Sequence, residues 1–390
     1  MVLVAAMALA ACGSDGDGDQ ADPPGTTAAG GAGPSEEQEL EVATAYADGV
    51  LAAYDESIAG AEDLRAALDA LVAGPTDATL GAAKEAWLVA RDAYGPTEAF
   101  RFYDGPIDDP EDGPEGQVNA WPMDEAHVDY VEGNPGAGIV NMAAEFPEIT
   151  TDVLESANEE GGETNISTGW HAIEFLLWGQ DLSEDGPGAR PVSDYTTAPN
   201  AARRATYLTL LADLLVEDLT GVRDQWDSDG GAYRTEFLAD PHAALSSIVR
   251  GIGALNTGEL GGERMAVAYE TKDQEDEHSC FSDNTTADVR NNLLGVQMVY
   301  TGGYPGASGP SVSGLVAELD PDLDATLREQ LGASIALVDD WPTTFDRMIS
   351  GEDDGQGRTA FLATVTAIED QGTTLAQVAD LLGIQVNFEV

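Results

Sequence analysis

The chain has 390 residues, of which 43% are hydrophobic, so it is long enough and apolar enough for one large or two ordinary folded domains. Its 72 Asp and Glu residues face only 16 Lys and Arg residues, which gives a formal net charge of -56. A charge of this sign repels phosphate backbones and excludes nucleic acid as a partner. It attracts cations, although acidic side chains spread along a whole chain usually form only a solvated surface.

The first residues have the pattern of an export signal. An apolar run leads to the sequence Leu-Ala-Ala-Cys, which ends at Cys12 and resembles the lipobox of bacterial lipoproteins, in which the cysteine is acylated. No Lys or Arg precedes the run, so an ordinary apolar N-terminus is the alternative. We expect a signal peptide over residues 1–12 and lipidation at Cys12. Residues 13–34, rich in Gly, Ala, Asp and Pro, are expected to be a flexible linker.

Helical signals dominate the remainder of the chain. Ser35 begins a capping box, and the apolar period that follows it predicts a helix to about residue 72. Thr76 is placed to cap a second helix over residues 77–102. Because strand-like alternation is scarce, we predict an all-α fold. Further helices are expected from residue 123 and at residues 147–159, 167–178, 200–226, 241–270, 286–300, 321–338 and 357–383.

Long loops suggest how the helices are grouped. The loop at residues 183–199 predicts a boundary between an N-terminal helical bundle, residues 35–190, and a C-terminal helical bundle, residues 191–390. Two other loops, at residues 104–117 and 271–285, exceed a dozen residues, and loops of that length in compact domains are usually functional. If Cys12 is lipidated, Cys280 has no partner for an intramolecular disulfide, so stability must come from packing.

The segment of residues 167–178 is apolar almost throughout and has two titratable side chains, His171 and Glu174. A helix that is apolar on all sides is buried, so both groups lie in a core or line a cleft. Their i, i+3 spacing puts them on one helix face, about 5–6 Å apart at Cβ. A neutral imidazole and a carboxylate placed in this way form half of a transition-metal site. A buried His–Glu hydrogen-bonded pair without a ligand is the alternative.

Gly169, His171 and Glu174 form the sequence GxHxxE, which is the signature of the imelysin family. The resemblance extends over about residues 40–385. Residues 97–103 and 119–125 resemble the first half of the family's iron-regulated lipoprotein branch, and residues 262–265 and 276–284 resemble its second half. This resemblance implies an all-helical protein of two bundles, with the GxHxxE helix near their junction. It also implies an exported envelope protein linked to iron acquisition, in a family that carries a peptidase label.

The same resemblance directs attention to residues outside the GxHxxE helix. Glu98 lies beside apolar residues and is expected to point to the junction, with an ion pair to Arg101 or Arg91 as the alternative. Glu277 and His278 belong to a motif too specific for a mere linker, with a surface acidic cluster as the alternative. The predicted metal ligands are His171, Glu174, Glu98, Glu277 and His278. The residues expected to support them are Asp129, Arg101 and Trp121.

The predicted cofactor is a divalent or ferric metal ion, with iron favoured and zinc or manganese as alternatives. The expected protein is an envelope lipoprotein, anchored in a bacterial membrane, that captures metal or takes part in iron uptake together with uptake-system proteins. An imelysin-type metallopeptidase and a metal-free helical binding module are the alternatives. The zinc-protease patterns HExxH and HxxEH both need a second histidine, but Phe175 follows Glu174 here, so an enzyme is not expected.

Lipidation of Cys12 can be tested in a bacterial host that expresses the gene from its start. We expect the protein to partition into detergent and to incorporate labelled palmitate, because acyl chains on Cys12 would insert into the membrane. The variant Cys12→Ser should lose both properties. A variant that stays as firmly membrane-bound as the wild type would contradict the lipid anchor.

Overall fold

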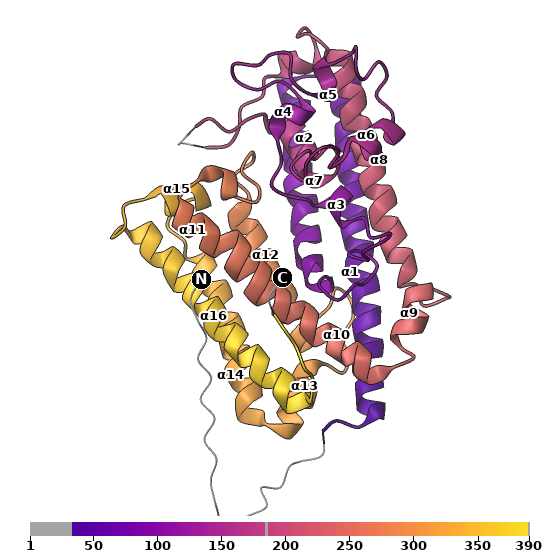
Figure 1. Cartoon of the computed structure of the whole chain (residues 1–390), viewed down its shortest axis with the longest axis vertical. Coiled ribbons are helices and arrows are strands. Elements are labelled where there is room, and N and C mark those ends of the chain that lie inside the picture. The colour runs from indigo at the N-terminus through magenta and orange to yellow at the C-terminus, as the bar shows by residue number, and fades with distance from the viewer. Residues whose placement is uncertain (1–32, 184–185, 389–390) are drawn as a thin grey trace, which may run out of the picture. The chain divides into compact units, whose positions relative to one another are not determined.

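The computed structural model describes residues 33–183 and 186–388, which belong to one folded unit of packed helices (Figure 1). Helix accounts for 67% of the chain, and the described residues contain no strand, so the predicted all-α fold is confirmed. No helix within these residues is long and apolar enough to cross a membrane. The predicted signal peptide, the lipidation site Cys12 and nearly all of the predicted linker lie outside the described residues.

The first two helices begin where their capping residues predict. α1 (Glu36–Ala73) follows Ser35, whose hydroxyl accepts from the backbone of Gln38 at 3.3 Å, while the Gln38 side chain accepts from the Ser35 backbone at 3.0 Å. α2 (Asp77–Tyr94) has the same reciprocal arrangement after Thr76. Such bonds satisfy amide groups that the first helical turn leaves unpaired. The two helices pack side by side.

α7 (Gly169–Trp178) is the GxHxxE helix, and all of its residues are buried. It begins at Gly169, which has a φ of 81°. A Cβ atom at this position would lie 2.4 Å from the Val118 carbonyl oxygen, so only glycine fits. The helix ends at Gly179, which has a φ of 72°. These two glycines bound a short, fully buried helix whose only titratable side chains are His171 and Glu174.

The other long helices lie close to their predicted positions, and several short ones were not predicted. The long ones are α8 (Ala201–Gln225), α10 (Pro241–Ala254), α12 (Thr285–Thr301), α14 (Pro321–Asp339) and α16 (Gln356–Leu382). The short ones are η1 (Gly95–Phe100), α3 (Glu115–Val118), α4 (Glu125–Val128), α5 (Gly138–Asn141), α6 (Thr151–Ala157), η2 (Val192–Tyr195), α9 (Ala232–Phe237), η4 (Gln274–Asp276), α13 (Val312–Leu319) and α15 (Phe345–Ser350). Of these, η1, α4 and α6 lie where helices were predicted, over residues 77–102, from residue 123 and at residues 147–159.

The helix predicted over residues 241–270 contains an irregularity that the sequence does not reveal. α10 continues into η3 (Leu255–Ala266), a π-helical segment, and α11 (Val267–Thr271) follows without a break. π-Helical segments are rare and are frequent at functional sites. Here the segment carries Arg264, whose guanidinium group reaches Glu98 on η1 at 2.6 Å.

Two hydrophobic clusters fill the interior. The larger one takes side chains from α1, α2, α7, α8 and α10, and also from α12, α14 and α16. The smaller one lies between η3, α12, α14, α15 and α16. α8 packs against α1 and α7, so helices from both sides of residue 190 share the larger cluster. The domain boundary placed at residue 190 stays a prediction.

Asp129, which the sequence assigned to the surroundings of the metal, lies in a buried ion-pair network. Its carboxylate is 2.9 Å from Arg190 Nη1 and 2.6 Å from Arg204 Nε. Burial by itself would raise the pKa of Asp129, but the hydrogen bond and charge of Arg204 and the charge of Arg190 bring that pKa below its usual value. Within the described residues, the hydrogen bonds of the Asp129 side chain go to other residues than His171 and Glu174. The group fastens α8 to the segment after α4.

The variant Asp129→Asn should be strongly destabilised, because it leaves two buried guanidinium groups short of a counter-charge. We expect the free energy of unfolding to fall by about 3–5 kcal/mol, as measured by urea denaturation. The control Asp48→Asn breaks the pair with Arg234, in which the Asp48 side chain is 53% exposed. That control should lose less than about 1 kcal/mol. Equal losses in the two variants would contradict the importance of burial.

Candidate metal centre

α7 meets the 277–284 loop, which connects η4 to α12, through the carboxylate of Glu174. One Glu174 oxygen lies 2.9 Å from Nδ1 of His171, one helical turn earlier. The other accepts from the backbone amide of Ser282 at 2.9 Å and from its hydroxyl at 2.6 Å. Burial raises the pKa of Glu174 to about 8, while the two Ser282 donors favour the ionised form. Both oxygens of Glu174 are therefore already occupied by hydrogen bonds.

When Glu174 is ionised, its bond to His171 determines which nitrogen of His171 is available. When Nδ1–H donates to the carboxylate, the lone pair of the ring lies at Nε2. The Nε2 atom of His171 is buried and has no hydrogen-bond partner. Burial lowers the pKa of His171 well below its usual value, and the charges of Arg91 and Arg264 lower it further. The ring is therefore neutral, which is the form that binds metals.

His278 of the 277–284 loop lies against His171, with ring centroids 4.8 Å apart. Its Nε2 atom is also buried without a partner. Burial, the Arg264 guanidinium and the neighbouring imidazole all lower the pKa of His278. The Trp121 ring packs on both histidines, at 4.9 Å from His171 and 6.3 Å from His278. Two neutral imidazoles with unpaired nitrogens thus share one aromatic wall.

A cavity of about 530 Å³ reaches His278 and Trp121, which are among the residues that line it. Arg101 and Arg264 form part of its wall. Carboxylates are more numerous there than guanidinium groups, and a cleft of one charge sign concentrates ions of the opposite sign. The acidic residues of the lining are Glu115, Glu159, Glu163, Glu259, Glu263, Glu275 and Asp276.

The carboxylate of Glu98 accepts hydrogen bonds from four neighbouring side chains. Arg101 Nη1 and Arg264 Nη2 lie 3.1 Å and 2.6 Å from its Oε2 atom. Tyr94 and Asn119 donate to its Oε1 atom at 2.9 Å and 3.3 Å. Burial would raise the pKa of Glu98, but the arginines lower it to about 2. Glu98 thus forms an ion pair with Arg101, which was the alternative to a role as metal ligand, and a second one with Arg264. To bind a metal, Glu98 would have to give up these contacts.

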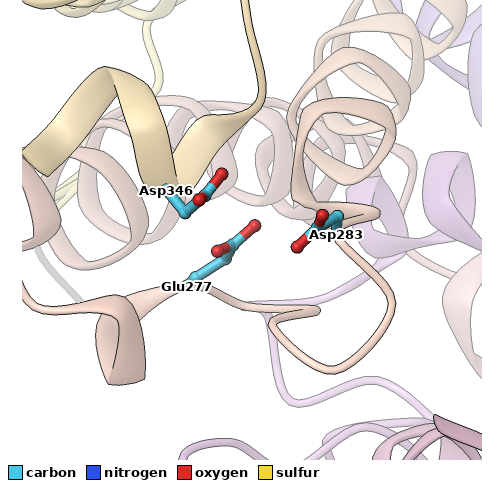
Figure 2. A group of neighbouring side chains, drawn as sticks. All are labelled: Glu277, Asp283 and Asp346. Atoms are coloured by element: carbon cyan, nitrogen blue, oxygen red, sulfur yellow. The ribbon is translucent and has the colours of Figure 1, made fainter. Parts of the chain in front are cut away.

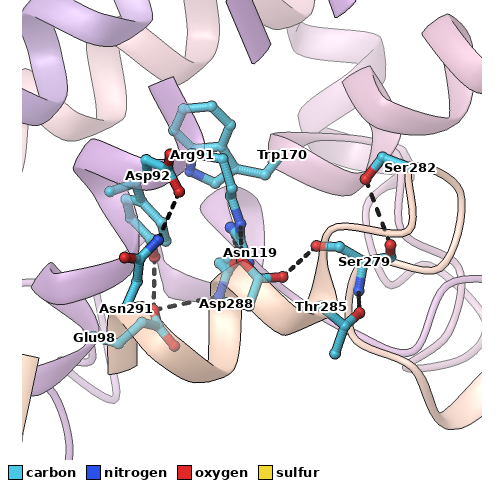
Figure 3. A network of polar contacts seen from close by, with 12 residues as sticks. Arg91, Asp92, Glu98, Asn119, Trp170, Ser279, Ser282, Thr285, Asp288 and Asn291 are labelled. Atoms are coloured by element: carbon cyan, nitrogen blue, oxygen red, sulfur yellow. Dashed lines mark hydrogen bonds and ion pairs between the residues drawn. The ribbon is translucent and has the colours of Figure 1, made fainter. Parts of the chain in front are cut away.

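A chain of buried polar contacts links Glu98 to the 277–284 loop (Figure 3). Asn119 donates to Glu98 and accepts from Arg91. Arg91 Nε in turn lies 2.9 Å from Asp288 on α12, and Asp288 accepts from the hydroxyl of Ser279 in the loop. The sequence did not single out Asn119, Asp288 or Ser279 as site residues, because their contacts join segments far apart in the chain.

Glu277 takes part in a different cluster from its neighbour His278. Its carboxylate faces Asp283 and Asp346, and one oxygen from each of the three residues lies within 4.8 Å of the other two (Figure 2). Burial raises the pKa of Glu277 well above its usual value, and the Asp346 and Asp283 charges raise it further. Asp283 belongs to the motif at residues 276–284, whereas no sequence pattern marks Asp346 on α15.

The structure therefore divides the five predicted ligands among three places. His171, Glu174 and His278 come together, Glu98 lies in the arginine network, and Glu277 lies in the carboxylate group. Of the predicted supporting residues, Trp121 contacts both histidines, while Arg101 pairs with Glu98 and with Glu115.

The arrangement of Ser282, Glu174 and His171 is not a serine nucleophile relay. The carboxylate lies between the hydroxyl and the imidazole. In a Ser-His-Asp triad the imidazole lies between the other two groups, because it must take the proton from the hydroxyl. These three residues are instead arranged to hold His171 in one orientation.

The family model for imelysin, Peptidase M75, matches residues 50–375. The chain belongs to the imelysin family, as its GxHxxE helix and all-α fold indicated. A more particular relative is the iron-regulated protein A of Synechococcus elongatus, which is 28% identical over 338 residues, covering 84% of this chain and 81% of that protein.

Two crystal structures share the fold. An iron-regulated protein A precursor from Parabacteroides distasonis has a TM-score of 0.70 and 19% identity, and the match covers 90% of this chain and 97% of that one. An imelysin-like protein from Psychrobacter arcticum has a TM-score of 0.63 and 14% identity, with 91% and 98% covered. The helical arrangement is therefore that of known imelysin-like proteins.

The lowered pKa of His278 predicts a pH-dependent stability in the presence of a chelator. Below about pH 6.5 the histidines of the unfolded chain take up protons, while the buried imidazole stays neutral. Because the unfolded state then binds more protons, stability falls as pH falls, by up to about 1.4 kcal/mol per pH unit for one histidine. Urea denaturation between pH 7.5 and 5.5 should show a steeper loss for the wild type than for His278→Gln. Equal slopes would contradict the neutral, buried state of His278.

Proposed function

We propose that this protein binds a metal ion through His171 and His278 and serves in metal capture during iron acquisition at the bacterial envelope. The observation that carries the proposal is the pair of adjacent, neutral imidazoles whose Nε2 atoms are buried without a partner. Buried polar atoms are normally hydrogen-bonded, because leaving one unpaired costs free energy. A metal ion would supply the missing partner for both nitrogens.

In this proposal Glu174 orients His171. Histidines that bind metals usually donate their second N–H to a carboxylate or carbonyl, which fixes the ring and increases its basicity. The 2.9 Å contact between Nδ1 and Glu174 has this form, and Ser282 fixes the carboxylate from the other side. Glu174 becomes a direct ligand, as the sequence predicted, only if it gives up one of these bonds.

The choice of metal follows from the ligands and from the relatives. Imidazole nitrogens suit iron and zinc, and carboxylate or water ligands that complete the shell also suit manganese. Iron is favoured because the curated relative is called iron-regulated protein A. The acidic cavity that reaches His278 would draw cations from solution toward the pair. With two protein nitrogens as ligands, the remaining positions stay open to water or a carrier group, which suits capture and release.

Location at the envelope and an uptake-system partner also belong to the proposal. The apolar N-terminal run and the lipobox-like sequence before Cys12 support export and lipid anchoring. The metallopeptidase alternative rests on the family's label, Peptidase M75, and the second histidine of the zinc-protease helix is replaced by Phe175. A metal-free binding module remains the second alternative, and metal titration separates it from the proposal.

Metal titration of the purified protein tests the histidine pair. Saturating Fe²⁺ or Zn²⁺ should raise the melting temperature of the wild type, because a ligand of the folded state stabilises it by mass action. The variants His171→Ala and His278→Ala should bind at least about tenfold more weakly, and Glu174→Gln about 10–100-fold more weakly, since an orienting partner matters nearly as much as a ligand.

The matched control is His242→Ala, since the His242 side chain is 52% exposed and contacts Glu39 rather than the pair. Its response to metal should equal that of the wild type. Metal content measured on the protein as purified gives a second readout that does not depend on stability. If the wild type and all variants respond alike to every metal, the imidazole pair is not a metal site and the metal-free alternative holds.

A further inference from the structure

Three carboxylates from separate segments converge beside α15 (Figure 2). Glu277 and Asp283 come from the two ends of the 277–284 loop, and Asp346 comes from α15. One oxygen from each lies within 4.8 Å of the others. Glu277 is completely buried, Asp346 is 8% exposed, and Asp283 is half-buried. The cluster is therefore built into the protein and differs from the solvated acidic residues that cover its surface.

The hydrogen bonding of this cluster is incomplete. Both carboxylate oxygens of Glu277 are buried and meet no donor at hydrogen-bonding geometry. The Oδ1 atoms of Asp283 and Asp346 are buried without a partner as well. Native proteins leave few buried polar atoms unpaired, and carboxylate oxygens are among the costliest to leave so. Four unpaired oxygens that lie together indicate a missing positive group.

The surrounding charges do not supply that group. Asp181 acts on Asp283 as a further negative charge, and Arg347 offsets only part of the repulsion. The Thr285 hydroxyl near Glu277 opposes the effect of burial only in part. Like charges that share a buried site are strongly unfavourable unless a cation neutralises them or a proton is taken up.

We propose that Glu277, Asp283 and Asp346 bind a hard divalent cation, of the Ca²⁺ or Mn²⁺ type, at a site separate from the imidazole pair. Hard cations prefer carboxylate, carbonyl and water oxygens, and this group offers carboxylate oxygens alone. Ca²⁺ takes six to eight oxygen ligands in flexible geometry. The partial exposure of Asp283 lets water complete the shell.

The cation would fix the loop that forms part of the imidazole site. Glu277 is bonded to His278 in the chain, and Asp283 directly follows Ser282, which donates to Glu174. A cation that joins the ends of the 277–284 loop to Asp346 would therefore hold His278 and Ser282 against α7. This link to metal capture rests on the proposed function, whereas the carboxylate site does not.

Calcium binding to the full folded chain is the test, because Ca²⁺ has little affinity for imidazole. Isothermal titration calorimetry with CaCl₂ should show one saturable site in the wild type. Glu277→Gln and Asp346→Asn should weaken it by at least about tenfold, as expected when a ligand is lost. The controls Glu352→Gln and Asp354→Asn make the same chemical changes at exposed positions and should bind as the wild type does.

Thermal unfolding adds a readout that does not depend on the calorimetric signal. In chelator, Glu277→Gln and Asp346→Asn should melt at or above the wild-type temperature, because each removes a charge from a repulsive group. In excess Ca²⁺ the order should reverse, since the tighter site of the wild type gains more stabilisation than the weakened sites of the variants at the same Ca²⁺ concentration. Variants that melt below the wild type in chelator and bind Ca²⁺ equally well would overturn the proposal, as would a wild type without saturable binding.

The variant His171→Ala separates this proposal from the proposed function. If both are right, His171→Ala binds Ca²⁺ like the wild type but has lost its response to Fe²⁺ or Zn²⁺. If the imidazole pair is not a metal site, the Ca²⁺ results still stand. If the carboxylate site is absent, Glu277→Gln and the wild type bind Ca²⁺ equally, whatever His171→Ala does with iron.

Discussion

A guanidinium group stays charged in a protein, so a buried arginine must keep a counter-charge or destabilise the fold by several kcal/mol. Two such arginines lie at the centre of this protein. Arg91 on α2 pairs with Asp288 on α12, and Arg264 on η3 pairs with Glu98 on η1. Each pair joins a segment of the first hundred residues to one beyond residue 260. The position of α12 and η3 against α2 and η1 therefore depends on satisfying these four charges, and the 277–284 loop follows through Ser279.

The same charges set the chemistry of the histidines. Arg91 and Arg264 lower the pKa of both His171 and His278, in addition to the effect of burial. Neutral imidazoles are ready to bind a cation without first losing a proton, and two nearby guanidinium groups would also limit how much positive charge the site tolerates. The buried network thus holds the 277–284 loop in place through Asp288 and Ser279. The same arginines lower the pKa of His278 in that loop.

The 277–284 loop connects two clusters of different chemistry. His278 and Ser282 contribute to the side that faces α7, while Glu277 and Asp283 contribute to the carboxylate group with Asp346. Alternation of this kind places residues of a nitrogen-rich and an oxygen-rich cluster on one short segment. Residues 277–282 are all buried, whereas Asp276, Asp283 and Asn284 are partly exposed.

The sequence by itself determined the features that depend on neighbouring residues. Capping residues placed the starts of α1 and α2, and the apolar composition of residues 167–178 placed His171 and Glu174 in the interior. The GxHxxE helix and the residues around it also determined the family. Only the tertiary structure decided which partner each buried charge meets. Glu98 meets Arg264, Glu277 meets Asp346, and His278 meets His171, because segments distant in the chain pack together, and no local pattern encodes such contacts.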